Sequence, residues 1–161
     1  RVIAVDVQDD KLAFARQLGA TDTVNASDPD AVEQVKELTK GGVDYAVELA
    51  GVPAALEAGY AMCRRGGTVV TAGLPRPEAT LDVPIAQLVS DNRTIKGSYM
   101  GSCVPRRDIP RFLSLYRQGK LPVDRLRSGF VDFKGLNAGF DRLAAGDAVR
   151  QVLRPHGTTK V

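Results

Sequence analysis

The stretch that decides the fold is residues 1–20, RVIAVDVQDDKLAFARQLGA, in which a short apolar run ends at Asp6 and a helix-like pattern follows. The run VIAVD has the length and the β-branched content of a buried strand. Apolar residues then recur at helical spacing as far as Gly19, and glycine is a typical helix terminator. The stretch therefore predicts a strand, an acidic strand end and a helix in direct succession.

The same alternation continues along the chain. After the first strand, VIAVD, strand-like segments are expected over residues 22–26, 43–51, 67–73, 93–102 and 148–153, with one more strand after residue 128. Helix-like segments lie between them, over residues 9–18, 27–42, 53–67, 85–92 and 107–120 and before a turn at Gly146. Strands that alternate with helices favour an α/β layered fold with a largely parallel sheet.

Acidic and hydroxyl side chains mark the expected helix starts. Asp9 or Asp10 is the candidate N-cap of the first helix, and Ser27 or Asp28 is that of the second. Asp108 is expected to cap the helix over residues 107–120.

Composition excludes several classes of protein. The chain has 161 residues, of which 43% are hydrophobic and 25% charged, so it has the length and composition of about one globular domain. The formal charge of +3 comes from scattered arginines without interleaved aromatics, which argues against nucleic acid as a partner. No apolar stretch approaches the ~20 residues that span a bilayer. Two cysteines do not make a disulfide framework and fit a reducing cytosol, so a cytoplasmic location is expected.

The expected strand ends carry the chemistry. In a parallel sheet, ligands bind outside the carboxyl ends of the strands, and four strands end at Asp6, Glu48–Gly51, Ala72–Gly73 and Gly97–Gly101. An acid at the end of the second strand of a dinucleotide-binding fold accepts hydrogen bonds from ribose hydroxyls and repels a 2′-phosphate, which favours NAD over NADP. Taken alone, Asp6 is also a common turn former, and each glycine is a common turn residue. Their recurrence in order favours the cofactor interpretation.

Five segments in register then resemble one family. VIAVDVQDDKLAFARQLGATDTVNA, GVDYAVELAG, GGTVVTAGLP, NRTIKGSYMGS and GFDRLAAGDAVRQVL are similar to segments of the medium-chain, zinc-dependent alcohol dehydrogenases. The resemblance covers nearly the whole chain and implies a Rossmann-like, doubly wound parallel sheet. It also implies a partial dinucleotide-binding domain over residues 1–125 and, over residues 126–161, a C-terminal segment that returns towards a catalytic domain.

On the adenosine side, the resemblance implies five cofactor-binding residues. Asp6 would hold the adenosine ribose, Val7 would lie against the adenine, and Lys11 would reach the ribose from the first turn of the helix. Leu49 and Gly51 would border the adenosine. These roles are those of the family's cofactor domain, carried over position by position.

On the nicotinamide side, the resemblance implies a second group. Ala72 and Leu74, on either side of Gly73, would lie along the nicotinamide ribose and the carboxamide. Ser98 and Met100 would present backbone groups to the carboxamide, although relatives often have an aromatic residue in place of Met100.

Arg150, in the last expected strand, would pair with the pyrophosphate, because a planar guanidinium suits phosphate oxygens. One more surface arginine is the alternative interpretation of Arg150.

The chain also departs from the family. A glycine-rich turn is expected ~20 residues before the ribose acid, whereas only five residues precede Asp6. We therefore expect a truncated chain, without the first strand, the first helix, the catalytic domain or the zinc ligands. Cys63 falls on an apolar helical stripe and is expected in the core, and Cys103 and His156 have no ligand-like spacing. No catalytic residue and no metal ligand is expected here, and the zinc would belong to the full-length parent.

The strand order has a consequence for the fold. In the order 3-2-1-4-5-6, a missing first strand leaves strands 2 and 4 roughly 10 Å apart. We expect either that these two strands pair directly or that a second chain fills the gap. The segment over residues 93–102 corresponds to the strand through which the family dimerises, so a homodimer or tetramer through it is expected.

Three functions remain open from the sequence. The leading hypothesis is the NAD-binding portion of a zinc-dependent alcohol dehydrogenase, which interconverts an alcohol and an aldehyde or ketone by hydride transfer; this chain alone is expected to be inactive. The first alternative is a zinc-free quinone or enoyl reductase of the same family, against which Asp6 argues because those enzymes usually prefer NADPH. The second is a non-catalytic nucleotide-binding fragment or scaffold.

Overall fold

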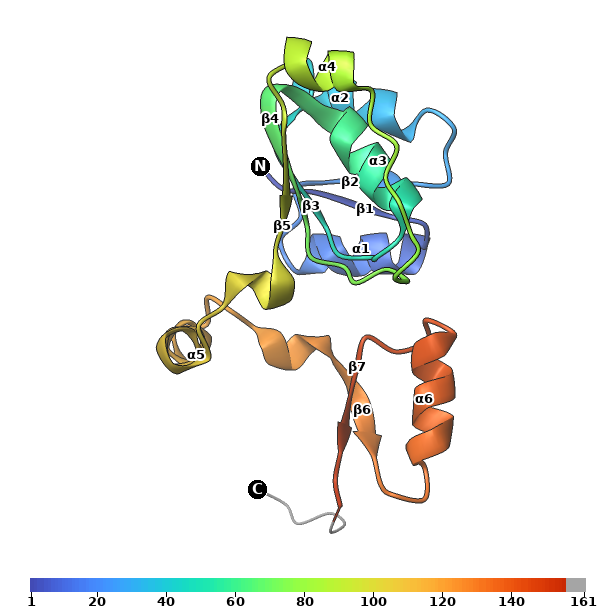
Figure 1. Cartoon of the computed structure of the whole chain (residues 1–161). Coiled ribbons are helices and arrows are strands. Elements are labelled where there is room, and N and C mark those ends of the chain that lie inside the picture. The colour runs from blue at the N-terminus through green and yellow to red at the C-terminus, as the bar shows by residue number, and fades with distance from the viewer. Residues whose placement is uncertain (156–161) are drawn as a thin grey trace. The chain divides into compact units, whose positions relative to one another are not determined.

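The computed structural model describes residues 1–155, and the chain divides into two compact units, Arg1–Cys103 and Val104–Val161. The first unit alternates strands and helices along its whole length (Figure 1). Its elements are β1 (Ile3–Asp6), α1 (Asp9–Gln17), β2 (Asp22–Asn25), α2 (Ala31–Thr39), β3 (Val43–Glu48), α3 (Pro53–Met62), β4 (Cys63–Thr71), α4 (Ile85–Ser90), β5 (Thr94–Gly97) and the 3₁₀ turn η1 (Tyr99–Ser102).

All the strand pairs of the first unit are parallel. β1 pairs with β2, and β3, β4 and β5 lie side by side in that order. Strands β2 and β1 correspond to positions 3 and 2 of the order 3-2-1-4-5-6, and β3, β4 and β5 correspond to positions 4, 5 and 6. The expected Rossmann-like α/β fold is confirmed.

Two apolar clusters hold the first unit together. Val24, Ala31, Val35 and Met62 form one cluster, which joins β2 to α2 and α3. Tyr60, Cys63 and Val69 form the other, between α3 and the sheet β3–β4–β5. Helix α1 contacts β1 and β2, and Figure 1 shows it on the opposite side of the strands from α3. Helices on both faces are the defining feature of a doubly wound sheet.

Strand β3 differs from the buried strand that its sequence predicts. Ala46 packs into the cluster under α3, but Tyr45 and Val47 are 73% and 64% exposed. Alternate residues of a strand point to opposite faces, and α3 covers only the face on which Ala46 lies. A continuous apolar run thus gives no information about which face is covered.

The expected direct pairing across the centre of the fold is not formed. Among the described residues, β1 pairs with β2 alone and β3 pairs with β4 alone. Of the two expected alternatives, the direct pairing of these strands is therefore wrong for this structure, and a second chain in the gap stays a prediction.

Two expected helix starts are also displaced. Asp9 and Asp10 lie within the first turn of α1, after Gln8 at the N-cap, where their charges still suit the positive end of the helix. Helix α2 begins at Ala31 after Asp30, not at Ser27 or Asp28.

The strand expected over residues 93–102 ends early, at Gly97. Met100, Gly101 and Ser102 have φ values of 49°, 68° and 54°, so the backbone turns into η1.

The second unit contains α5 (Pro105–Arg117), η2 (Val123–Leu126), β6 (Arg127–Val131), α6 (Leu136–Ala144) and β7 (Arg150–Leu153). β6 and β7 are parallel, and α6 connects them and contacts β7. Helix α5 begins at Pro105, with Val104 at the N-cap, so Asp108 does not stand at the start of the helix as expected. Asp108 lies in the first turn, where its carboxylate accepts the backbone N–H of Val104 at 2.8 Å. In the described part of the chain, none of the helices is long and apolar enough to cross a membrane.

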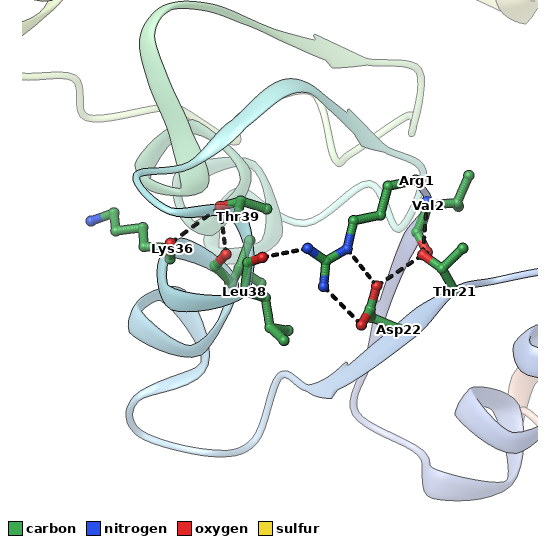
Figure 2. Close-up of polar contacts among 8 residues, drawn as sticks. Arg1, Val2, Thr21, Asp22, Lys36, Leu38 and Thr39 are labelled. Atoms are coloured by element: carbon green, nitrogen blue, oxygen red, sulfur yellow. Dashed lines mark hydrogen bonds and ion pairs between the residues drawn. The ribbon is translucent and has the colours of Figure 1, made fainter.

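A polar network links β1, β2 and α2 at the start of the chain. Figure 2 shows the Arg1 guanidinium between the Asp22 carboxylate and the backbone carbonyl of Leu38. Arg1 donates to both Asp22 oxygens, from Nε at 2.7 Å and from NH2 at 2.9 Å, and the Thr21 hydroxyl donates to the same carboxylate at 2.9 Å. These donors, Arg1 above all, lower the pKa of Asp22 to about 2.

This network predicts a pH dependence of stability. The folded-state pKa of Asp22 lies below its unfolded value, so the ionised carboxylate stabilises the fold above about pH 4, and this contribution is lost as the pH falls towards 2. We expect Asp22→Asn to flatten the pH dependence between pH 4 and 2, measured as urea midpoints of unfolding. Asp44→Asn, which removes one carboxylate from the exposed Asp44–Arg64 pair, is the matched control. An Asp22→Asn variant whose midpoints keep the full pH dependence contradicts this account.

Candidate dinucleotide-binding site

Asp6 is the last residue of β1 and stands immediately before the turn into α1. Its Oδ1 accepts the backbone N–H of Gln8 at 3.0 Å, which is the turn-forming role that aspartate often plays. Within residues 1–155, its Oδ2 accepts no hydrogen bond. One carboxylate therefore shapes the turn with one oxygen and presents the other at the carboxyl end of a parallel strand.

The turns that follow β3 and β4, residues 49–51 and 72–74, touch each other through their backbones; we call them the paired turns. A Cβ added to Gly73 would lie 2.5 Å from the Cα of Gly51, and closer still to its nitrogen. A Cβ on Gly51 would meet backbone atoms of Leu74 at 3.1 Å, and Gly51 has a φ of +71°. Glycine is required at both positions, at Gly73 by space and at Gly51 also by conformation.

Glu48 and Thr71 join the ends of the two strands, and their partnership was not expected from the sequence. The Glu48 side chain accepts the Gly51 N–H at 2.6 Å on Oε1 and the Thr71 hydroxyl at 2.7 Å on Oε2. The Ala72 N–H donates to the Glu48 carbonyl at 2.9 Å, which extends the contact between β3 and β4 past the end of β4. The spacing of Glu48 and Gly51 was visible in the sequence, but the pairing with Thr71 was not.

Exposed apolar side chains lie beside these strand ends. Four of the residues assigned to the cofactor by resemblance are between 61% and 84% exposed: Val7, Leu49, Leu74 and Met100. They follow β1, β3, β4 and β5, respectively. Apolar side chains exposed at the ligand-binding edge of a parallel sheet suit the flat rings of a nucleotide.

Ser98 continues the same edge on β5. Its backbone N–H donates to the Thr71 carbonyl at 2.9 Å, and its hydroxyl lies 3.0 Å from that of Ser102. Met100, in the left-handed conformation, follows in η1.

Two of the expected site residues belong neither to the paired turns nor to the strand ends beside them. Lys11 is in the first turn of α1, five residues beyond Asp6. Arg150 is an exposed residue at the start of β7, in the second unit. The structure describes Arg150 within that unit alone.

No metal site is formed in the described part of the chain, where no three His, Cys, Asp or Glu side chains gather. Cys63 lies in the core as predicted, and burial raises the pKa of its thiol. It is the first residue of β4, however, because the helix expected over residues 53–67 ends at Met62. His156 lies outside the described residues.

The arrangement of these residues suits the binding of a dinucleotide. Asp6, with one oxygen that accepts no hydrogen bond among the described residues, ends β1, and glycine turns in backbone contact follow β3 and β4. Exposed apolar side chains follow the same strands. The fold is of the Rossmann-like class, and these strand ends lie where ligands bind in that class.

The chain belongs to the zinc-binding dehydrogenase family, whose model matches residues 1–118. It is 32% identical over 157 residues to alcohol dehydrogenase 1 of Oryza sativa subsp. indica, and this match covers 96% of the chain and 41% of the rice protein.

Solved structures of alcohol dehydrogenases also resemble this chain. Benzyl alcohol dehydrogenase from Acinetobacter calcoaceticus superposes with a TM-score of 0.90 at 33% identity, over 95% of this chain and 42% of that one. An alcohol dehydrogenase zinc-binding domain protein from Burkholderia ambifaria gives 0.90 at 35% identity, over 96% and 42%. An NAD-dependent alcohol dehydrogenase is also among the structural matches. The chain thus spans less than half the length of these relatives.

Proposed function

We propose that this chain is the NAD-binding portion of a zinc-dependent alcohol dehydrogenase, in which an alcohol and an aldehyde or ketone are interconverted by hydride transfer. In this proposal, residues 1–125 belong to the dinucleotide-binding domain, and residues 126–161 are the segment that returns towards the catalytic domain. The observation that carries the proposal is Asp6, whose Oδ2 is open at the carboxyl end of β1 while Oδ1 holds the turn into α1.

The residues of this chain fit the cofactor. The open oxygen of Asp6 can accept hydrogen bonds from both ribose hydroxyls, and its charge disfavours a 2′-phosphate, which selects NAD. The paired turns offer bare backbone on which the dinucleotide can lie extended, and Val7 and Leu74 offer exposed apolar surface at its two ends. When NAD is bound, its nicotinamide supplies the hydride acceptor. This chain binds and orients the cofactor and excludes water from its inner face.

Zinc enters the proposal only through the full-length protein. The described residues contain no cluster that could hold a metal, so no step is assigned to zinc here. A cytoplasmic location is part of the proposal and rests on the low cysteine content.

The proposal is tested by turnover of the full-length protein. We expect alcohol-dependent reduction of NAD, followed by NADH absorbance, and loss of turnover after dialysis against a zinc chelator, with recovery when zinc is added. Turnover that needs no zinc would point to the reductase alternative. Binding of NAD without turnover on any alcohol would point to the non-catalytic alternative.

We also propose a homodimer, or a tetramer built from it, through β5. This strand is one of the two outer strands of the sheet β3–β4–β5 in the described part of the chain, and its side chains Thr94 and Lys96 are exposed. An outer strand presents unpaired backbone groups that a second copy can match. Light scattering on the purified chain is expected to give twice the mass of the chain or a higher even multiple, and a monomer at micromolar concentration would contradict this.

A further inference from the structure

Glu48 is one of two charged residues that are buried among the described residues, with only 7% of its surface exposed. It ends β3, and its carboxylate turns towards β4 instead of towards solvent. A buried carboxylate is costly unless hydrogen bonds satisfy its oxygens. Both oxygens of Glu48 are satisfied, one by the Gly51 N–H at 2.6 Å and one by the Thr71 hydroxyl at 2.7 Å. These two hydrogen bonds fix the two strand ends that the carboxylate connects.

They hold the paired turns against each other. Gly51 belongs to the first turn, and Thr71 leads directly into the second, so the carboxylate bridges the two. The backbone contact between Gly51 and Gly73 leaves no room for either turn to shift towards the other. The short hydrogen bonds prevent the opposite movement, apart from each other. The paired turns are thus fixed in both directions.

We infer that Glu48 is a positioning residue that sets the spacing between the adenosine side and the nicotinamide side of the cofactor site. The inference rests on the proposed function, in which residues 49–51 border the adenosine and residues 72–74 lie along the nicotinamide ribose. A ligand that spans both turns gains from their fixed spacing, because the cost of ordering them is already met before binding. A ligand that contacts only one turn gains much less.

The chemistry of the bridge predicts which substitutions preserve it. A glutamine at position 48 keeps one oxygen to accept the Gly51 N–H, and its amide NH₂ can donate to the Thr71 hydroxyl oxygen. An alanine keeps neither partner and leaves the Gly51 N–H unpaired. Glu48→Gln is therefore the conservative variant and Glu48→Ala the disruptive one. Both variants lack the negative charge of Glu48, so the loss of charge does not account for a difference between them.

The test compares a spanning ligand with a half ligand. Calorimetry on the full-length protein measures the affinity for NAD and for AMP in the wild type, Glu48→Ala and Glu48→Gln. We expect Glu48→Ala to weaken NAD binding about tenfold and AMP binding by less than about threefold, because preorganisation benefits mainly the ligand that meets both turns. Glu48→Gln is expected to restore NAD binding to within about threefold of the wild type, since its hydrogen bonds are retained.

Several outcomes overturn the inference. Equal losses for NAD and AMP would show that Glu48 only supports the fold, and an unchanged NAD affinity in Glu48→Ala would show that the bridge does not matter. A wild-type protein that binds neither nucleotide would overturn the proposed function itself, and the inference with it. The absence of binding in the wild type can be told apart from a failure of the inference alone, in which the wild type binds NAD but the Glu48 variants do not show the expected pattern.

Thr71 provides a second, milder test that does not depend on the Glu48 variants folding. Thr71→Val removes the hydroxyl and keeps the β-branched shape, whereas Thr71→Ser keeps the hydroxyl. Thr71→Val is expected to weaken NAD binding only about threefold, because the hydrogen bond between Gly51 and Glu48 remains. AMP binding is expected to stay close to that of the wild type. Thr71→Ser is expected to bind NAD with nearly the wild-type affinity. Thr71→Val and Thr71→Ser with the same NAD affinity would contradict the bridge.

Discussion

Replacing Gly73 with alanine is expected to abolish most of the cofactor-dependent activity of the full-length protein. The new Cβ would lie 2.5 Å from the Gly51 Cα, and backbone atoms cannot rotate away as side chains do. The paired turns would have to separate, and a displacement of about 1 Å in a positioning element can cost on the order of 100-fold in rate. We therefore expect kcat/KM for NAD to fall about 100-fold, by steady-state kinetics.

The same substitution is expected to destabilise the chain by about 1–3 kcal/mol, as overpacked substitutions do, measured by urea unfolding. Gly97→Ala is the matched control: it also lies at the end of a strand, but a Cβ there meets nothing within 4 Å. If the two variants show the same kcat/KM for NAD, then the contact between the paired turns does not shape the site.

Replacing Asp6 with asparagine is expected to change the choice of cofactor. Asparagine keeps the oxygen that accepts the Gln8 N–H and so preserves the turn into α1. It removes the negative charge, which would otherwise face a 2′-phosphate at a cost of several kcal/mol. The ratio of kcat/KM for NAD to that for NADP is therefore expected to fall about 100-fold in the full-length protein.

Asp10→Asn is the matched control for Asp6→Asn, because it also removes one negative charge close to the turn into α1. Asp10 lies in the first turn of α1, and its Oδ1 accepts the Lys11 N–H. This variant is expected to keep the wild-type preference between NAD and NADP. An Asp6→Asn enzyme with an unchanged preference would leave Asp6 with its turn-forming role alone and would remove the ribose assignment.

Local features of the fold were predictable because they depend on residues that are close together in the sequence. The alternation of strands and helices, the acid at the end of the first strand and the glycines after β3 and β4 all follow from short-range patterns. The core position of Cys63 was predicted from its spacing with Leu56 and Tyr60, and Cys63 does pack against Tyr60, although it begins β4. Helix starts were harder to place. Residues 27–30 contain three side chains that are able to cap a helix, and the structure has the last of them, Asp30, at the N-cap position of α2.

Features that depend on two distant elements were not predictable in the same way. Glu48 and Thr71 are 23 residues apart, and their hydrogen bond requires β3 and β4 to be neighbours in a fixed register. The exposure of Tyr45 and Val47 depends on which face of β3 is covered, and an apolar run does not encode that. Sequence therefore predicted the strand ends and their glycines, whereas the structure showed how the paired turns are held together.

The most direct test of the central claim is a crystal structure of the full-length protein with NAD bound. We predict that the open oxygen of Asp6 accepts hydrogen bonds from the adenosine ribose hydroxyls, and that the dinucleotide lies across the paired turns. In that structure the other oxygen of Asp6 still accepts the Gln8 N–H, as it does here. A cofactor that binds elsewhere, or an Asp6 that contacts Gln8 and no ribose, would contradict the claim that this chain is the NAD-binding portion of an alcohol dehydrogenase.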